Sequence, residues 1–546
     1  MPTAKLAKHG WKILFLGIAI FYLFGLGVLP LVGPDEPRYA EVAREMLARR
    51  DLITPTLGGI PWFEKPSLLY WMMIASYRVL GVTEYAARLG PALCGLLTAA
   101  LVFWLGRTVE RSAPPTESEV RTNLGEWSAL VFLSSLGAIA FSRSASFDIV
   151  LTMTLSGALS CFFVWLIRDR DGTKAPLRLL CAFYVFIGLS LLAKGLVGIV
   201  LPFGVIAAYF LIRREWPNRR FVFSLTWGLP IALIVAASWY GPMFHRHGWT
   251  FVDQFIIQHH FARFLSNKYH HPQPFYFYVP TIAWLSTPWS LFLLSAFISV
   301  IRGWRKKRAD RFSGFCLVWV VLPLVFFSLS GSKLPGYVLP VMPAVALLVG
   351  NELTGVMDSA ARTRLIRVTG ILLIVLSIVG GWFAFRELAL PIWLVSVGLL
   401  LALLTGGFAL VFAARRTAVP ILALFSFAVM GLGIEGARVL EARSSVRDVV
   451  QAANARGYAS TPVFCLLCDD RTAEFYAGGR LMYEPTGEPA RFEGAQDVAA
   501  AIHQKGGVGL VLIESRWEKQ LTNYQAVQTE KIADNGRVTL FAVRVR

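Results

Sequence analysis

The sequence predicts an α-helical membrane protein that carries a small soluble α/β domain at its C-terminal end. Hydrophobic residues make up 55% of the 546-residue chain, and the mean hydropathy is +0.56. Charged residues make up only 16%, against about 25% in ordinary soluble domains. Soluble domains of this total length could not bury so much apolar surface, so we expect most of the chain to lie in a bilayer.

The chain is strongly basic, with 53 Lys and Arg residues against 34 Asp and Glu residues and a net charge of +19. A nucleic-acid-binding protein would gather this charge on a soluble surface. Here the basic residues form short clusters between apolar runs, which is typical of the loops of a membrane protein. We therefore exclude nucleic acid as a partner.

Apolar runs long enough to cross a bilayer as helices recur as far as residue 439. We predict thirteen spanning helices, over residues 11–32, 86–108, 126–143, 147–167, 177–193, 196–212, 221–241, 279–301, 313–330, 338–354, 366–385, 391–414 and 418–437. Basic clusters follow every second span, and Lys5, Lys8 and Lys12 precede or open the first. By the positive-inside rule the N-terminus is then cytoplasmic and the C-terminal domain lies on the outer side.

Two regions outside the spans differ in character. The outward loops at 33–85 and 242–278 are long and belong to the predicted membrane domain, residues 1–439. Residues 440–546 contain thirteen Lys and Arg residues and thirteen Asp and Glu residues, so this part is neutral. Strand-like runs (462–467, 508–513, 537–545) alternate there with helix-like runs (444–456, 496–504), which predicts a small α/β domain.

The first outward loop holds candidate catalytic residues. Asp35 follows Gly33-Pro34, and the simplest interpretation is that its side chain caps a helix over about 36–50. Capping and catalysis are compatible, because a carboxylate at a helix start is held rigidly. Glu64 and Lys65 follow in the aromatic-rich segment Trp62–Trp71, which is otherwise typical of a segment lying in the membrane interface.

Further ionisable residues lie at the outer ends of other spans: Asp148, Lys194, Lys333 and Tyr337. Each alone is compatible with a snorkelling or capping side chain. Together with the loop residues they place acids and lysines on the outer side of the membrane. The positive-inside rule does not account for lysines on that side. Charge near lipid is costly and usually functional, and phosphate is the natural partner for such lysines.

Six of the eight histidines lie between residues 245 and 271, with Arg263 among them. Imidazoles near a carboxylate can hold Zn²⁺. No tight spacing matches a metal motif, however, and histidines at a membrane interface need not bind anything.

Several strings resemble the bacterial 4-amino-4-deoxy-L-arabinose lipid A transferases, which are integral-membrane glycosyltransferases of the C-type fold related to protein O-mannosyltransferases. They are Pro-Asp-Glu-Pro-Arg-Tyr-Ala-Glu (34–41), Trp-Phe-Glu-Lys-Pro-Ser-Leu-Leu-Tyr-Trp (62–71), Ala-Arg-Leu-Gly-Pro-Ala-Leu (87–93), Ala-Lys-Gly-Leu-Val-Gly (193–198), His-Phe-Ala-Arg-Phe (260–264) and Ser-Lys-Leu-Pro-Gly-Tyr-Val-Leu-Pro (332–340). The resemblance covers about residues 1–440. Ser67 departs from it, since many relatives have a second proline there.

The resemblance implies an inverting transfer of the aminopentose from undecaprenyl phosphate to lipid A phosphate, at the periplasmic face of a bacterial inner membrane. It implies resistance to polymyxin and cationic peptides as the outcome. Its catalytic residues would be Asp35, Asp148 and Glu64. Its substrate-binding residues would be Lys65, Arg38, Lys194, Arg263, Lys333 and Tyr337. The chemistry requires no cofactor, although family precedent implies a zinc ion on Glu64 and the loop histidines, His260 before His259. We expect a monomer.

Three alternatives stay open. A related transferase would use another sugar or a protein hydroxyl acceptor. A lipid transporter or flippase would need charged residues near the bilayer midplane and two similar halves, neither of which the sequence contains. A sensor would work through residues 440–546.

Overall fold

The computed structural model describes residues 2–112, 122–170, 175–262, 273–306, 310–356, 359–414, 417–441 and 445–546. The chain divides into two compact units. We call one the helical unit, made of Met1–Phe24, Glu64–Leu69 and Leu89–Gly433, and the other the mixed unit, made of Gly25–Phe63, Tyr70–Arg88 and Ile434–Arg546. Most of the first outward loop therefore groups with the C-terminal residues, whereas Glu64–Leu69 groups with the helices.

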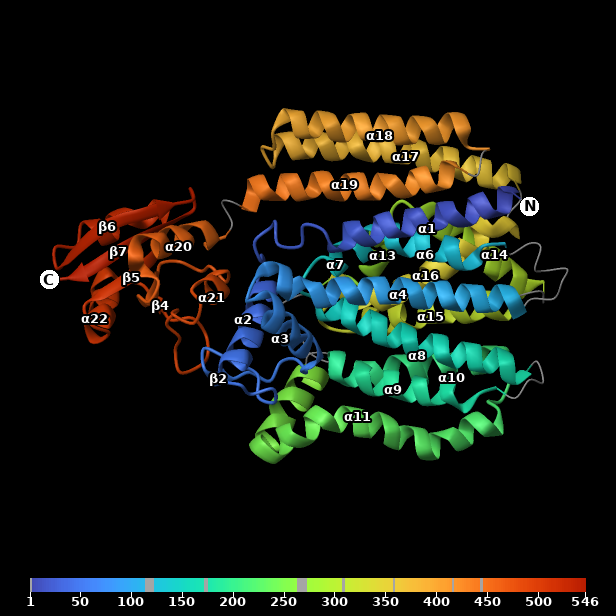
Figure 1. Cartoon of the computed structure of the whole chain (residues 1–546), viewed down its shortest axis with the longest axis horizontal. Helices are drawn as coiled ribbons and strands as arrows, with labels where there is room; N and C mark the ends of the chain where they lie inside the picture. Colours follow the sequence, from blue (N-terminus) through green and yellow to red (C-terminus); the bar gives the residue numbers. More distant parts are fainter. Residues whose placement is uncertain are drawn as a thin grey trace. The chain divides into compact units, whose positions relative to one another are not determined.

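The helical unit consists almost entirely of helices, many of them long (Figure 1). They are α1 (Pro2–Leu23), α6 (Leu124–Ser134), α7 (Leu136–Ser142), α8 (Phe147–Arg170), α9 (Leu177–Lys194), α10 (Val197–Arg213), α11 (Arg219–Phe251), η1 (Val252–Ala262), α13 (Tyr278–Leu285), α14 (Ser290–Arg305), α15 (Arg311–Ser328), η2 (Pro335–Val341), α16 (Met342–Asn351), η3 (Glu352–Val356), α17 (Ser359–Arg386) and α18 (Ile392–Phe412). Two more, α4 (Glu84–Ser112) and α19 (Ala418–Glu441), begin or end in the mixed unit.

Within the described residues, nine helices are long and apolar enough to span a membrane, or eleven if each of two bent pairs counts as one span. The chain is thus a multi-span membrane protein, but the predicted number of thirteen is not confirmed. The predicted run 126–143 is broken into α6 and α7, bent by 64°, because Ser135 has extended backbone angles. The predicted run 279–301 is broken into α13 and α14, bent by 117°.

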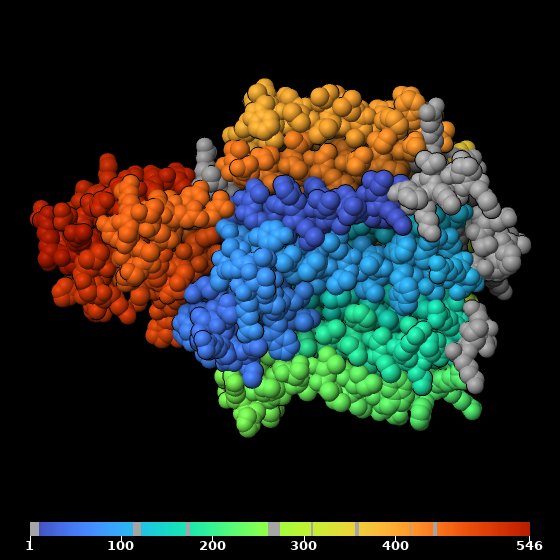
Figure 2. All heavy atoms as spheres, viewed as in Figure 1, coloured from blue at the N-terminus to red at the C-terminus, as the bar shows by residue number. Residues whose placement is uncertain are grey.

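The helices differ in how deeply they are buried within the protein. In the most apolar stretch of α8, 94% of the residues are buried, against 17% for Ala360–Arg386 and 22% for α18. Helices α17 and α18 pack along each other and form one edge of the helical unit (Figure 2). Their exposed side chains are large and apolar, including Ile371, Leu376 and Leu404. Such a surface suits contact with lipid and not with water.

The C-terminal part of the mixed unit contains a five-stranded sheet with strand order β4-β3-β5-β7-β6. The strands are β3 (Val463–Leu466), β4 (Arg491–Phe492), β5 (Val508–Glu514), β6 (Val527–Asp534) and β7 (Val538–Val545). Strand β3 is parallel to β4 and β5, whereas β7 is antiparallel to β5 and β6. Helices accompany the sheet: α20 (Arg447–Ala453), η4 (Asn454–Tyr458), α21 (Ala473–Tyr476), α22 (Ala495–Gln504), η5 (Ser515–Trp517) and α23 (Glu518–Thr522). The predicted small α/β domain is confirmed.

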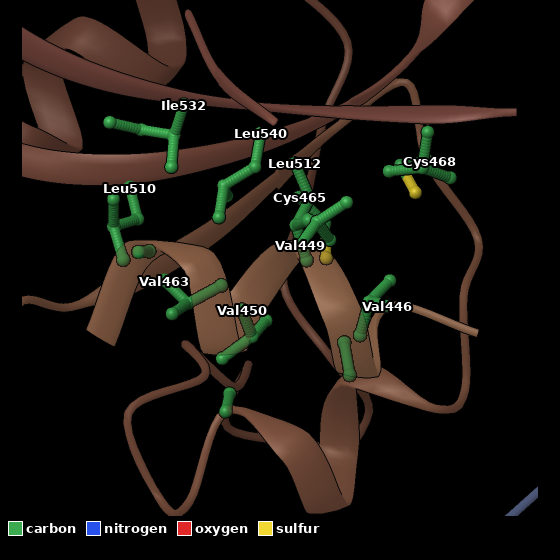
Figure 3. Packing of buried hydrophobic residues seen from close by; sticks show 14 of the residues in the cluster. Val446, Val449, Val450, Val463, Cys465, Cys468, Leu510, Leu512, Ile532 and Leu540 are labelled. Atoms are coloured by element: carbon green, nitrogen blue, oxygen red, sulfur yellow. The ribbon is translucent and has the colours of Figure 1, made fainter. Parts of the chain in front are cut away.

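Successive side chains of β3 point to opposite faces of the sheet, and each face carries a hydrophobic core. Val463 and Cys465 pack with Val449 and Val450 of α20 (Figure 3), and Phe464 packs on the opposite face with residues of α22. Cys468 belongs to the first core as well. The turn that brings it there passes through residue 467, which has a positive φ of 49°.

The first outward loop also contributes structure. Helix α2 (Asp35–Ala48) is followed by the short antiparallel pair β1 (Thr56–Leu57) and β2 (Ile60–Pro61), and then by α3 (Leu68–Leu80). Helix α2 packs against α21 within the mixed unit.

Candidate active site

Asp35 is the first residue of α2, and its side chain is exposed. The prediction that Asp35 caps the helix is wrong: the cap position is Pro34, and no side chain caps it. The carboxylate that does turn back is that of Glu36, which accepts a hydrogen bond of 3.3 Å from the backbone N–H of Val32. The Asp35 carboxylate has no hydrogen bond or ion pair with the part of the chain that the structure describes. It is therefore open to substrate.

Arg88 holds the backbone that leads to Asp35. This guanidinium is 4% exposed and forms a two-pronged ion pair with Glu36, at 2.7 and 3.1 Å. It also donates hydrogen bonds of 2.7–2.9 Å to three backbone oxygens, those of Leu26, Leu29 and Pro30. A planar group with five donors suits this task, and a lysine could not replace it. Sequence reasoning missed Arg88, although a charged residue at the start of an apolar helix was a signal.

Arg38 lies one turn after Asp35 on α2. Its Nε is 3.7 Å from a carboxylate oxygen of Glu474 in α21, and its guanidinium carbon is 5.9 Å from the centre of the Trp62 ring. Its charge is thus balanced by an acid of the C-terminal domain. Its predicted role in binding substrate phosphate stays a prediction.

In the helical unit, three of the predicted residues meet. The ammonium of Lys194, the last residue of α9, forms an ion pair with Asp148 in the first turn of α8. The same ammonium lies 4.6 Å from the ring centre of Tyr337 in η2. A cation over an aromatic face and beside a carboxylate is well stabilised, so Lys194 is held in one place.

Gly336 makes this arrangement possible. A Cβ atom at residue 336 would lie 2.1 Å from the carboxylate oxygen Oδ2 of Asp148. Any other residue would displace that carboxylate or the η2 backbone. The glycine therefore lets η2 approach the Asp148–Lys194 pair closely, where Tyr337 can cover the lysine.

Lys333 is almost fully buried, at 7% exposed, and it lies after α15. Its ammonium donates a hydrogen bond of 2.7 Å to the backbone oxygen of Ser330. A buried ammonium needs such a partner. The structure thus gives Lys333 a local structural contact, and its predicted contact with phosphate stays a prediction.

Glu64 and Lys65 lie between β2 and α3 and are half-buried. They belong to the short segment Glu64–Leu69 that groups with the helical unit. The Glu64 carboxylate has no hydrogen bond or ion pair with the residues that the structure describes. The Glu64 carboxylate is therefore available to a ligand.

The predicted zinc site receives no support. His259 is half-buried in η1, but the side chain of His260 and all of Arg263 lie outside the described residues. Among the side chains that the structure describes, no three from His, Cys, Asp and Glu gather closely enough to hold a metal ion. The described residues do not fit a metal centre, and we derive no step through one.

Comparison with known proteins places this geometry in context. The sequence profile of the dolichyl-phosphate-mannose-protein mannosyltransferases matches residues 12–252, which include Asp35, Lys65, Asp148 and Lys194.

Relatives of known name carry the similarity further. The chain is 32% identical over 379 residues to the undecaprenyl phosphate-α-4-amino-4-deoxy-L-arabinose arabinosyl transferase of Serratia proteamaculans, covering 67% of this chain and 63% of that protein. It is 30% identical over 355 residues to the enzyme of the same name from Yersinia enterocolitica, covering 64% of this chain and 60% of that protein. The matched part of the chain thus spans less than two thirds of the length of these relatives.

A solved structure matches the whole chain. ArnT from Cupriavidus metallidurans bound to undecaprenyl phosphate superposes with a TM-score of 0.80 at 23% identity, over 98% of both chains. The apo form of the same protein gives a TM-score of 0.79. This likeness confirms the C-type glycosyltransferase fold predicted from the sequence. The chain is therefore a homologue of the undecaprenyl phosphate-aminoarabinose arabinosyl transferases over about two thirds of its length, and it has the fold of ArnT over 98% of its length.

Proposed function

We propose that this protein transfers 4-amino-4-deoxy-L-arabinose from undecaprenyl phosphate to a phosphate group of lipid A. The observation that carries the proposal is the identity of 30–32% with transferases of that name, together with a shared fold over 98% of the chain. The reaction would take place at the periplasmic face of a bacterial inner membrane. The N-terminus would be cytoplasmic and the mixed unit periplasmic, and the enzyme would work as a monomer.

The reaction is a single displacement with inversion at the anomeric carbon. An oxygen of the lipid A phosphate attacks that carbon, and the bond from the carbon to the donor phosphate oxygen breaks. Undecaprenyl phosphate leaves with the electron pair. Because the attacking phosphate is already ionised at neutral pH, the step needs no strong general base.

Cationic residues would stabilise the departing phosphate. Negative charge grows on it in the transition state, and a preorganised cation in a site of low polarity stabilises such charge strongly. Lys65 and Lys194 are the described residues best suited to this, with Arg38, Lys333, Tyr337 and Arg263 as further predicted contacts. Asp148 would hold Lys194 in place until the donor arrives.

Asp35 would act on the sugar. Its exposed carboxylate has no described partner, so it can pair with the cationic amine of the aminopentose and with the positive charge that develops at the anomeric carbon. Glu64 would assist in the same way. If the acceptor were instead a protein hydroxyl, Asp35 would have to remove its proton as a general base.

A second candidate function is that of an O-mannosyltransferase or another transferase with a polyprenyl-phosphate donor. The match of residues 12–252 to the dolichyl-phosphate-mannose-protein mannosyltransferases favours it. The same residues would serve, so substrate assays must separate the two candidates.

Mass spectrometry of lipid A tests the proposal. Cells that make the aminoarabinose carrier lipid are compared with and without the protein, with Asp35→Asn, and with the control Glu514→Gln, whose carboxylate pairs with Arg516 at the end of β5. A gain of one aminopentose per modified phosphate that Asp35→Asn abolishes and Glu514→Gln preserves would support the proposal. A gain of a different sugar would exclude aminoarabinose as the sugar that is transferred. Unchanged lipid A would exclude lipid A phosphate as the acceptor.

A further inference from the structure

The backbone before Asp35 is bound by a side chain of the C-terminal domain. The hydroxyl of Tyr476, the last residue of α21, accepts a hydrogen bond of 2.7 Å from the backbone N–H of Leu31. Leu31 is fully buried, so without this oxygen its amide would lose a partner that water could not easily replace.

The same hydroxyl is held from its other side. It donates a hydrogen bond of 3.1 Å to Glu84 at the start of α4, and Glu84 also lies 3.6 Å from the guanidinium of Arg447 in α20. Because the hydroxyl has a fixed acceptor, its lone pairs are oriented toward the Leu31 amide. The Tyr476 hydroxyl is therefore fixed in place by hydrogen bonds on both sides.

A side chain of the first turn of α2, after Asp35, also contacts the same short helix. Glu474 has a fully buried side chain, and its carboxylate lies 3.7 Å from Arg38 and 2.9 Å from Arg471. Burial raises the pKa of Glu474, with the two arginines acting against that rise. Arg38 is three residues after Asp35, so this pair fixes the first turn of α2.

Asp35 itself has no side-chain partner among the described residues, so the position of its carboxylate depends on its backbone. On one side, Tyr476 binds the amide of Leu31, four residues before Asp35. On the other side, Glu474 pairs with Arg38, three residues after Asp35. Arg88 holds the same segment through Glu36 and the backbone oxygens before it. The first two contacts come from residues more than 400 positions away in the sequence. All of them lie within the mixed unit.

We infer that Tyr476 and Glu474 are positioning residues for the transfer reaction: the C-terminal domain sets the place of the Asp35 carboxylate through α21. The inference rests on the proposed function, because it assigns the C-terminal domain a part in the same reaction. Neither residue touches substrate. Tyr476 and Glu474 determine how often the Asp35 carboxylate occupies its productive position. That fraction governs the turnover rate more than it governs donor binding.

The test uses full-length protein in proteoliposomes with Tyr476→Phe, Glu474→Gln and the double variant. The matched controls are Tyr458→Phe, whose hydroxyl bonds Glu530 elsewhere in the same domain, and Glu514→Gln, whose carboxylate pairs with Arg516. We expect each test variant to lower kcat about tenfold, the scale of one lost buried hydrogen bond or ion-pair contact, and to change KM for the lipid donor less than twofold. The controls should match the parent protein.

Hydrogen exchange gives a readout that does not depend on activity. Amides of residues 26–38 should exchange several-fold faster in Tyr476→Phe and Glu474→Gln than in the two controls. Binding of undecaprenyl phosphate alone should be unchanged in all of them. A merely structural role would instead lower the melting temperature and donor binding together with kcat.

Two results would overturn the inference: parent-like kcat in the double variant, or faster exchange across the whole domain with no preference for residues 26–38. If the parent protein transfers no aminopentose, the proposed function fails. The exchange data then still decide whether α21 holds the start of α2.

Discussion

Asp35 and Asp148 are both acids at a helix start, yet they differ in what surrounds them. Asp35 has an exposed carboxylate with no partner among the described residues. Residues on either side of it are bound by Tyr476 and Arg88. Asp148 has a half-buried carboxylate that is already paired with Lys194. The first arrangement leaves a charge available to a ligand while fixing its position. The second uses the charge inside the protein to hold a lysine.

The comparison predicts the largest effect for Asp35→Asn. Removing a charge that acts only on substrate should lower transfer at least about 100-fold. Because the side chain is exposed and has no partner among the described residues, the free energy of unfolding should change by no more than about 0.5 kcal/mol. Transfer assays and thermal unfolding of the same preparation check this. Near-normal activity would show that the candidate site is misplaced.

Asp148→Asn should differ from Asp35→Asn in having a clear cost in stability. It leaves the Lys194 ammonium without its carboxylate in a partly buried place, and we expect a loss of about 2–3 kcal/mol, below the range for fully buried pairs. Denaturant unfolding in detergent measures it. Adding Lys194→Gln should restore part of the stability, and a double variant less stable than Asp148→Asn would argue against the pair.

Arg88→Lys tests how the backbone before Asp35 is held. A lysine keeps the charge but cannot bond Glu36 and three backbone oxygens at once, so we expect a loss of about 1–3 kcal/mol in the free energy of unfolding. Transfer should fall as well, by about tenfold. Arg302→Lys, in the last turn of α14, is the control. Equal stability of the two variants would contradict the role of Arg88.

Glu41 extends the comparison to an acid of α2 that is fully buried. Burial raises its pKa to about 7, with Glu45 and Glu474 adding to the rise and Arg44, which binds it at 2.6 Å, opposing it. The folded protein thus holds this proton more tightly than the unfolded chain does. The resulting stabilisation is fully present below the ordinary glutamate pKa of 4.5 and is lost as the pH rises through about 7.

Lowering the pH from 8 to 5.5 should therefore raise the melting temperature of the mixed unit by about 2–4 °C. Glu41→Gln should flatten this dependence, because an amide does not titrate. An identical pH profile in the variant would show that Glu41 does not carry the effect.

Much of the helical architecture could be predicted from the sequence, because a span of about 20 apolar residues is a local signal. Asp148, Lys194 and Tyr337 were expected to gather at the outer ends of different spans, but their contacts with one another were not predicted. Strand β6 was missed, since it is a sheet edge in which Lys531 and other polar residues interrupt the apolar pattern. The break after Leu285 contains Pro288, whose missing backbone N–H interrupts a helix, so this break had a local signal that the predicted run 279–301 passed over.

The residues that hold Asp35 could not be predicted in the same way. Arg88 bonds backbone oxygens 58–62 residues earlier, and Tyr476 bonds an amide 445 residues earlier. No spacing in the sequence encodes such contacts, because they form only when the C-terminal domain and the first outward loop fold into one unit. The cap expected of Asp35 was wrong for a related reason: Glu36, turned inward by Arg88, is the residue that bonds the backbone.

The absence of a side chain at Gly336 limits how this sequence can vary. A single added methyl group there would collide with Asp148, 188 positions earlier, and so separate that acid from Lys194. In a library of all single substitutions, position 336 should be as intolerant as the charged residues themselves, although glycine carries no chemistry of its own.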